Sequence, residues 1–225
     1  MNNLINPHIF RRKQKLETRP MTDSALRKKP AQARSRARYE AILAAAKALI
    51  AEKGSDTVKM SEVAERAGVP IGSVYQFFPD KGAIIQTLAE DYMEQVRAGL
   101  REEVKSITDK ESAGALIARL MDSYYAFFLM EPVARDIWCG TQADKRMQDI
   151  DIEDSRLNGE IFFAALKPLA PRAAWKSLKT DCFLMMQLTG AAVRLAVALD
   201  RKEGDRIIDA YKGMLLSKLM QNLES

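Results

Sequence analysis

Apolar residues recur at helical spacing along most of the chain from residue 33 onward. A first helix carries Ile42, Ala46, Leu49 and Ile50 on one face and ends at Gly54. The same period predicts further helices at 60–67, from 81 to about 100, before Pro132, and over 143–167, 173–199 and 205–222. No stretch alternates with a period of two for long enough to form a strand. The pattern therefore predicts an all-α protein.

The segment 67–78, AGVPIGSVYQFF, interrupts this pattern because its two glycines, its proline and its β-branched residues are poor helix formers. In MSEVAERAGVPIGSVYQFFP, residues 60–79, the apolar positions suit two short helices that pack steeply against a third helix. These positions are Val63, Ala67, Val69, Val74 and Phe77. Gly68 stands where the turn needs a left-handed backbone, and Pro70 fits the start of the second helix. The spacing indicates either a helix-turn-helix or a plain helical hairpin that binds nothing.

The charge distribution favours a polyanion as the partner of the first third of the chain. Residues 1–82 carry 16 basic and 8 acidic side chains, whereas residues 83–225 carry 19 basic and 22 acidic ones. The exposed positions of the second short helix are small, or carry hydroxyl or amide groups that can bond to DNA. These positions are Ile71, Gly72, Ser73, Tyr75 and Gln76.

Residues 57–85, TVKMSEVAERAGVPIGSVYQFFPDKGAII, resemble the DNA-binding region of the TetR family of bacterial transcriptional regulators. The resemblance runs from Tyr39 to Ile85 and rests on residues at family positions: Ala64, Ala67, Gly68, Val69, Gly72, Tyr75, Phe78 and Lys81. It implies a recognition helix at 71–77 in the major groove of double-stranded operator DNA, with Ile71 and Gln76 nearest the base edges. Ser73, Tyr75, Lys81 and Ser61 would then hold phosphates.

Two positions depart from the family pattern. Lys59 replaces a small hydroxyl residue that caps the preceding helix in relatives, so we expect Thr57 or Ser61 to take over the cap and Lys59 to contact the DNA backbone. Pro70 replaces a serine. The basic run 27–38 is either a solvated tail or an arm that follows phosphates or the minor groove.

Large, soft side chains are concentrated beyond residue 105 and either fill a core or line an apolar pocket. The pocket set is Met121, Tyr124, Tyr125, Phe128, Trp138, Phe162, Met185 and Met186. The family resemblance implies a small effector, apolar or aromatic, in such a pocket.

The last two predicted helices, 173–199 and 205–222, carry a large apolar surface. They either cover their own core or pair with a second copy as a four-helix bundle, and the resemblance favours the homodimer. The expected interface set is Ala191, Ala192, Leu195, Ile208, Tyr211 and Leu215.

Other classes of site find little support in the sequence. Acidic residues at 144–160 alternate with Lys145, Arg146 and Arg156, which suits a solvated helix better than a metal site. The single histidine, His8, lies in an arm expected to be disordered, and no phosphate loop is present, so we expect no catalytic residues, no metal and no cofactor. Cys139 and Cys182 have neither zinc nor disulfide spacing. No run approaches the roughly 18 apolar residues needed to span a membrane, which predicts a cytoplasmic protein.

The sequence thus predicts a basic arm at 1–32, a DNA-binding domain at 33–82 and a ligand-binding and dimerisation domain at 83–225. The expected function is that of a homodimeric repressor that binds a palindromic operator and is released by a small effector. The alternative is a helical dimer that binds DNA or protein partners without an effector. Met21 could also serve as a start, which would make residues 1–20 an extension.

Overall fold

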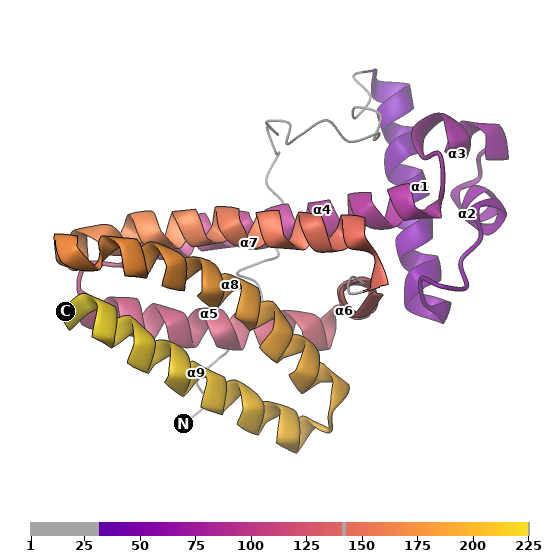
Figure 1. Ribbon diagram of the computed structural model, residues 1–225. Helices are drawn as coiled ribbons and strands as arrows, with labels where there is room; N and C mark the ends of the chain where they lie inside the picture. The colour runs from indigo at the N-terminus through magenta and orange to yellow at the C-terminus, as the bar shows by residue number, and fades with distance from the viewer. Residues whose placement is uncertain (1–31, 141–142, 225) are drawn as a thin grey trace. The chain divides into compact units, whose positions relative to one another are not determined.

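The computed structural model describes residues 32–140 and 143–224, and every regular element within those ranges is helical (Figure 1). The predicted basic arm at 1–32, except for its last residue, lies outside the described residues. The α-helices are α1 (Ala33–Lys53), α2 (Met60–Ala67), α3 (Ile71–Phe77), α4 (Lys81–Glu103), α5 (Lys110–Met130), α6 (Pro132–Gly140), α7 (Lys145–Leu166), α8 (Trp175–Ala198) and α9 (Arg201–Glu224). Short 3₁₀ turns are η2 (Val104–Ser106), η4 (Lys167–Leu169) and η5 (Arg172–Ala174).

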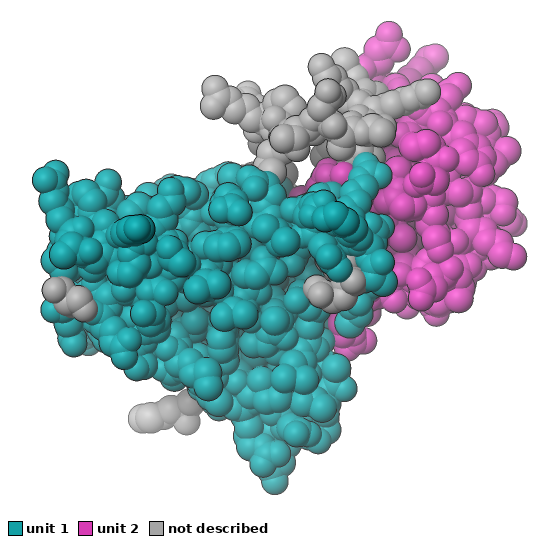
Figure 2. Space-filling view, in the orientation of Figure 1, with its two compact units in different colours: residues 1–12, 93–131, 138–225 teal, residues 13–92, 132–137 magenta. Residues whose placement is uncertain are grey.

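The chain divides into two compact units, coloured separately in Figure 2. Among the described residues, the N-terminal unit holds 32–92 and 132–137, and the C-terminal unit holds 93–131, 138–140 and 143–224. The division falls inside α4, between Tyr92 and Met93, and inside α6, between Ile137 and Trp138. Two helices therefore contribute residues to both units.

The core of the N-terminal unit forms where α1, α2 and α3 meet. Ile42, Val63 and Val74 are each almost fully buried. The ring of Tyr39 stacks on that of Phe78, with centroids 5.1 Å apart. Burying an aromatic or aliphatic side chain of this size contributes roughly 1.5–3 kcal/mol, so these contacts hold a short helix whose own propensity is low.

Glycine and proline set the turn between α2 and α3 as the sequence predicts. Gly68 has φ 65° and ψ 33°, the left-handed conformation that is strained for other residues. Pro70 lies immediately before α3, and its carbonyl accepts from the N–H of Ser73 at 2.8 Å. The cap of α2 differs from the prediction: the carboxylate of Glu62 accepts from the backbone N–H of Lys59 at 2.9 Å. Thr57 instead donates to the carbonyl of Lys53, at the end of α1.

The C-terminal unit is a bundle in which α8 packs against α5, α7 and α9, and α5 also packs against α9. Two glycines allow close backbone approach. A Cβ on Gly159 of α7 would lie 2.9 Å from the Cα of Phe183, and a Cβ on Gly204 of α9 would lie 2.4 Å from the carbonyl oxygen of Ala196. Substituting either glycine would force the helices apart.

Two helix boundaries and one property of α8 differ from the sequence predictions. The helix α9 begins at Arg201 instead of 205, and α7 begins at Lys145, where Asp144 caps it by accepting from the N–H of Arg146 at 2.8 Å. Contrary to expectation, the segment Arg172–Ala198 is long and apolar enough to cross a membrane by length and composition, with a mean hydropathy of 1.3. Core helices of soluble proteins can pass the same test, which makes this weak evidence for a membrane span.

Candidate DNA-binding surface and effector cavity

One side of the helix α3 packs into the core of the N-terminal unit, and the other side is exposed. Val74 is fully buried, whereas Ile71 and Tyr75 expose 42% and 50% of their surface. Gly72 and Gln76 are also exposed, and Ser73 is half-buried. Most of the side chains predicted to meet DNA therefore lie on the exposed face, where Gly72 adds no bulk.

The predicted phosphate contacts outside α3 have different environments. Lys59 and Ser61 are exposed. Lys81, in contrast, is half-buried, and its ammonium group donates to the carbonyls of Ser55 at 2.9 Å and Asp56 at 2.7 Å. Since both carbonyls lie in the segment between α1 and α2, Lys81 holds that segment in place.

The arginines at the start of α1 are exposed, whereas Arg66 on α2 is paired with an acidic residue. Arg34, Arg36 and Arg38 are exposed. Arg66 forms a two-pronged pair with Glu52, with bonds of 2.7 and 2.8 Å, and lies on α2 opposite the end of α1. A guanidinium in this geometry ties two helices together, so Arg66 is less available to an external anion than the α1 arginines are.

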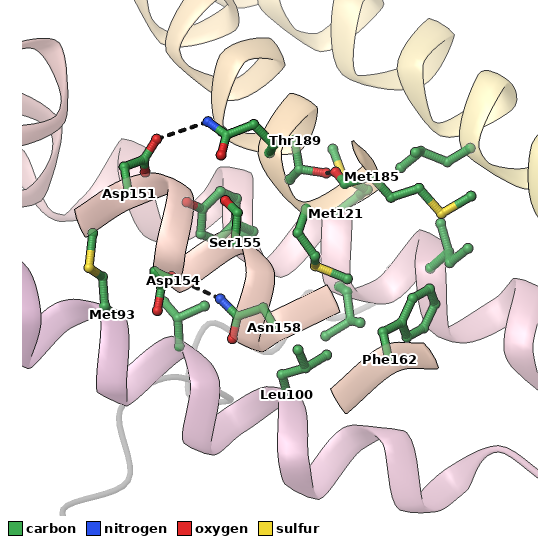
Figure 3. Close-up of a pocket in the computed structure, with 18 of the residues that line it drawn as sticks. Met93, Leu100, Met121, Asp151, Asp154, Ser155, Asn158, Phe162, Met185 and Thr189 are labelled. Carbon is green, nitrogen blue, oxygen red and sulfur yellow. Dashed lines mark hydrogen bonds between the residues drawn. The ribbon is translucent and has the colours of Figure 1, made fainter. Parts of the chain in front are cut away.

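The C-terminal unit contains a cavity of about 100 Å³ between α4, α5, α7 and α8. Its walls are mostly apolar, and Figure 3 shows Met93 and Leu100 on one side and Met121 and Phe162 among the other lining side chains. Six of the residues predicted to form a pocket line it: Met121, Tyr124, Trp138, Phe162, Met185 and Met186.

Tyr125 and Phe128 do not line this cavity, although both were predicted to do so. Phe128 lies on the same face of α5 as Tyr124 but one turn further along, and its ring packs on that of Tyr124 with centroids 5.0 Å apart, whereas Tyr125 lies on another face. A Cβ added to Gly204 would lie only 2.7 Å from the hydroxyl oxygen of Tyr125, so the side chain of Tyr125 points toward α9. The ring of Phe128 packs edge-on against Trp138, with centroids 5.7 Å apart. Phe128 therefore supports a lining residue from behind.

One wall of the cavity is polar and comes mainly from α7. Asp151, Asp154, Ser155 and Asn158 follow each other at helical spacing and all line the cavity, as Figure 3 shows. The guanidinium of Arg97 on α4 is bound by the carboxylate of Asp154. Despite that ion pair, burial raises the pKa of Asp154 from 3.8 to about 6. Burial also raises the pKa of Tyr124.

These α7 residues were missed because the acidic stretch reads as a solvated helix. Part of that interpretation matches the structure, since Lys145 pairs with Asp149 and Arg156 with Glu153 on the exposed side. The spacing of Asp151, Ser155 and Asn158 is the signal that could have separated a second, inward face.

Comparison with known proteins decides the family. A model described as "Tetracyclin repressor-like, C-terminal domain" matches residues 111–223, and one described as "Bacterial regulatory proteins, tetR family" matches residues 42–88. The chain belongs to the TetR family. Members of the TetR family are DNA-binding transcriptional repressors, often responsive to ligands, and are generally not enzymes.

Individual relatives match this chain in sequence over part of its length and in fold over most of it. The fatty acid metabolism regulator protein of Bacillus subtilis is 33% identical over 85 residues, which are 37% of this chain and 44% of that protein. The two curated relatives are matched over only 29% and 44% of their lengths. A TetR-family regulator from Streptomyces coelicolor superposes with a TM-score of 0.63 at 26% identity, covering 83% of this chain and 99% of the other.

Two solved structures of the same fold contain ligands. RolR in complex with resorcinol has a TM-score of 0.57 at 20% identity and covers 86% of this chain and 96% of its own. FadR from Bacillus subtilis in complex with stearoyl-CoA has a TM-score of 0.56 at 20% identity, covering 80% and 97%. At these identities the likeness shows the fold alone.

The residues predicted for the interface of a TetR-type dimer fall into two groups. Ala191 and Leu195 are exposed and Ala192 is half-buried. Ile208 and Leu215 are buried within their own subunit, where Leu215 lines the cavity. Tyr211 is half-buried and donates to the carbonyl of Met185 at 3.3 Å. The apolar stripe of α9 thus covers the core of its own subunit.

Proposed function

We propose that this chain is a repressor that binds a palindromic operator as a homodimer and leaves DNA when a small molecule occupies the cavity. In this account residues 33–82 form the DNA-binding domain and residues 83–225 form the effector-binding and dimerisation domain. The protein acts in the cytoplasm, where bacterial DNA is accessible. The observation that carries the proposal is α3, held by buried Val74 and exposed along Ile71, Tyr75 and Gln76.

Each exposed side chain has a role that fits its chemistry. Gln76 can pair with adenine through two hydrogen bonds, and Ile71 can contact a thymine methyl group, which favours A·T pairs in the operator. Tyr75, Ser73 and Ser61 carry hydroxyls suited to phosphates, and exposed Lys59 adds a charge for the backbone. Lys81 supports this surface through the carbonyls of Ser55 and Asp56, and any phosphate contact by Lys81 would share those bonds.

The dimer interface that we propose lies mainly on the exposed side of α8. Leu184, Leu188, Ala191 and Leu195 recur at spacings of four, three and four residues, and the three leucines expose between 44% and 53% of their surface. Met214 on α9 exposes 68%. A contiguous apolar surface of this kind is unfavourable in water and suits a two-fold contact with a second copy. This revises the expected set, because Ile208 and Leu215 already serve their own subunit.

The cavity supports effector control. It is mostly apolar and includes aromatic side chains such as Trp138 and Phe162, and all of its lining residues except those on α4 lie in the part of the chain matched by the C-terminal family model. Structural neighbours hold resorcinol in one case and stearoyl-CoA in the other, so this fold accommodates ligands with apolar parts. We expect a small apolar or aromatic effector here.

DNA binding is tested by selecting an operator from random duplexes and measuring its affinity by fluorescence anisotropy. Tyr75→Ala should lower operator affinity by at least about tenfold while the melting temperature stays unchanged, since Tyr75 contributes little to the core. The matched control is Ile152→Ala, which also truncates a large exposed side chain, on α7. Equal operator affinity of the Tyr75 variant and wild type would contradict the proposed surface.

A further inference from the structure

Two carboxylate–amide pairs stand on the polar wall of the cavity. The amide nitrogen of Asn158 donates to Asp154 at 2.8 Å, and that of Gln187 on α8 donates to Asp151 at 3.1 Å. Figure 3 shows the first pair, with both side chains on α7. A carboxylate only accepts hydrogen bonds, so each bond fixes which end of the amide faces its partner. The oxygen of each amide is then directed elsewhere.

These two amide oxygens have no hydrogen-bond partner among the described residues. Both Asn158 Oδ1 and Gln187 Oε1 are buried, and Asn158 as a whole exposes only 6% of its surface. A buried polar atom without a partner destabilises the structure, and an occupant of the cavity that donates hydrogen bonds to it removes that penalty. This wall therefore favours a ligand that donates hydrogen bonds.

The charge of the lining points in the same direction. The side chains that line the cavity include two carboxylates, Asp151 and Asp154, and no lysine, arginine or histidine. Arg97 lies behind the wall, where Asp154 and Glu94 bind it. Arg194 does not line the cavity, but it acts electrostatically on Tyr124, and its Nη1 is buried without a hydrogen-bond partner among the described residues, about one contact distance from Gly190, which does line the cavity. An anionic group placed against the α7 wall would meet the two carboxylates of Asp151 and Asp154 there.

Size limits the ligand further. The cavity measures about 100 Å³. Engineered apolar cavities of about 150 Å³ hold one benzene molecule. The cavity is smaller than these, so a single ring is the largest ligand it admits, once the flexible methionine side chains of the lining move outward, and a long acyl chain does not fit. The remaining walls are aliphatic, aromatic and thioether groups, which suit the faces of such a ring.

We propose that the effector is a one-ring, non-anionic molecule that carries at least two hydrogen-bond donors, hydroxyl or amine, and donates them to the amide oxygens of Asn158 and Gln187. This inference rests on the proposed effector function and names the chemistry of the ligand. The apolar face of the ring packs against Met121, Phe162 and Met185.

The test is direct binding to the full-length protein by calorimetry, without DNA. The probes are dihydroxybenzenes, their dimethoxy counterparts, which keep the ring and lose the donors, benzylamine-type cations with a hydroxyl group, and hydroxybenzoates, which add a negative charge. The diols or hydroxylated amines should bind at least about tenfold more tightly than the dimethoxy and benzoate probes. Tightest binding by the diols would assign neutral donors, and tightest binding by the amines would assign a cation.

Substitutions test whether the ligand's donors bind the amide oxygens of Asn158 and Gln187. Gln187→Met and Asn158→Leu keep side-chain volume and remove the acceptor, so each should weaken the tightest donor probe by about tenfold and leave the dimethoxy probe unchanged. Gln148→Met is the matched control, since Gln148 lies on α7 outside the cavity lining. Because the probe series uses wild-type protein, it decides the matter even if a variant fails to fold.

Three results would overturn the inference: equal affinity across the series, tightest binding by a benzoate, or no binding by any diol or amine. These outcomes leave effector control itself standing, since a different molecule could still release DNA. Conversely, a diol that binds as expected but leaves operator affinity unchanged supports the ligand chemistry and contradicts the proposed control.

Discussion

The carboxylate of Asp136 on α6 accepts a hydrogen bond from the backbone N–H of Ser55, 2.9 Å away, in the segment that joins α1 to α2. Both residues belong to the N-terminal unit. Two positions further along α6, Trp138 lines the cavity of the C-terminal unit. A single short helix therefore carries one residue that contacts the helix-turn-helix unit and another that an effector would touch.

Replacing Asp136 should weaken the coupling between effector and operator. In Asp136→Ala the N–H of Ser55 loses its partner, so a movement of Trp138 would no longer reach the α1–α2 segment through this bond. We expect effector affinity close to that of wild type, but a smaller loss of operator affinity on effector binding. Anisotropy titrations of operator DNA with and without effector measure the difference. In Asp136→Asn, which keeps an acceptor oxygen, coupling should be largely retained, and an Ala variant as responsive as wild type would count against this role.

The two lysines near α2 should respond differently to substitution. Lys59→Met should weaken operator binding and lower the slope of log affinity against log salt by about one, because an exposed phosphate contact releases about one counterion. Lys81→Met should instead lower the free energy of unfolding by about 1–3 kcal/mol, since two carbonyls lose a charged donor. Denaturant unfolding and salt titrations of operator affinity separate the two. A full drop in salt slope without loss of stability for Lys81→Met would show that Lys81 serves DNA alone.

How far the sequence could predict these features depends on whether local chemistry decides them. Gly68 and Pro70 set the turn through their own backbone preferences, so the helix-turn-helix was predictable, as was the burial of Val74. Which face of α7 turns inward depends on α4 and α8, far away in sequence, and the polar wall of Asp151, Asp154 and Asn158 was therefore missed.

The apolar helices at the end of the chain show the same limit. Leu195 and Leu215 look alike in the sequence, yet one is exposed and the other buried. Packing against α5 and α7 determines which apolar stripe covers the subunit's own core. Periodicity gives the stripes but not their partners.

The proposed dimer makes a clear prediction for α8. Leu188→Glu would place a charge in the apolar contact and should convert the protein to a monomer with operator affinity reduced by at least about a hundredfold, because a two-fold operator needs both recognition helices. Sedimentation measures the oligomeric state. Met130→Glu is the control, since Met130 is equally exposed at 50% but lies on α5 away from the stripe. A dimeric Leu188 variant would exclude the proposed interface.

Asp154 should make stability depend on pH. The folded protein raises its pKa from 3.8 to about 6 and thus holds the proton more tightly than the unfolded chain does. The free energy of unfolding should therefore fall as pH rises from about 4 to about 6, with about 1 kcal/mol lost from this group between about pH 5 and about pH 7.5. Arg97, Asp151 and Asn158 are the described groups that face it.

Comparing variants isolates that contribution. In Asp154→Asn the loss between the two pH values should be smaller by about 1 kcal/mol than in wild type, whereas Asp149→Asn, which changes an exposed aspartate of the same helix, should leave it unchanged. Denaturant unfolding at both pH values gives the numbers. Identical pH dependence in wild type and Asp154→Asn would contradict the raised pKa.

The central claim is that a molecule in the cavity lowers affinity for the operator. The most direct measurement takes the probe that calorimetry shows to bind most tightly, saturates the protein with it, and determines operator affinity by fluorescence anisotropy with and without the probe. The account predicts at least about a tenfold loss of operator affinity, which corresponds to a coupling free energy of about 1.4 kcal/mol. Unchanged operator affinity with the cavity saturated would contradict it.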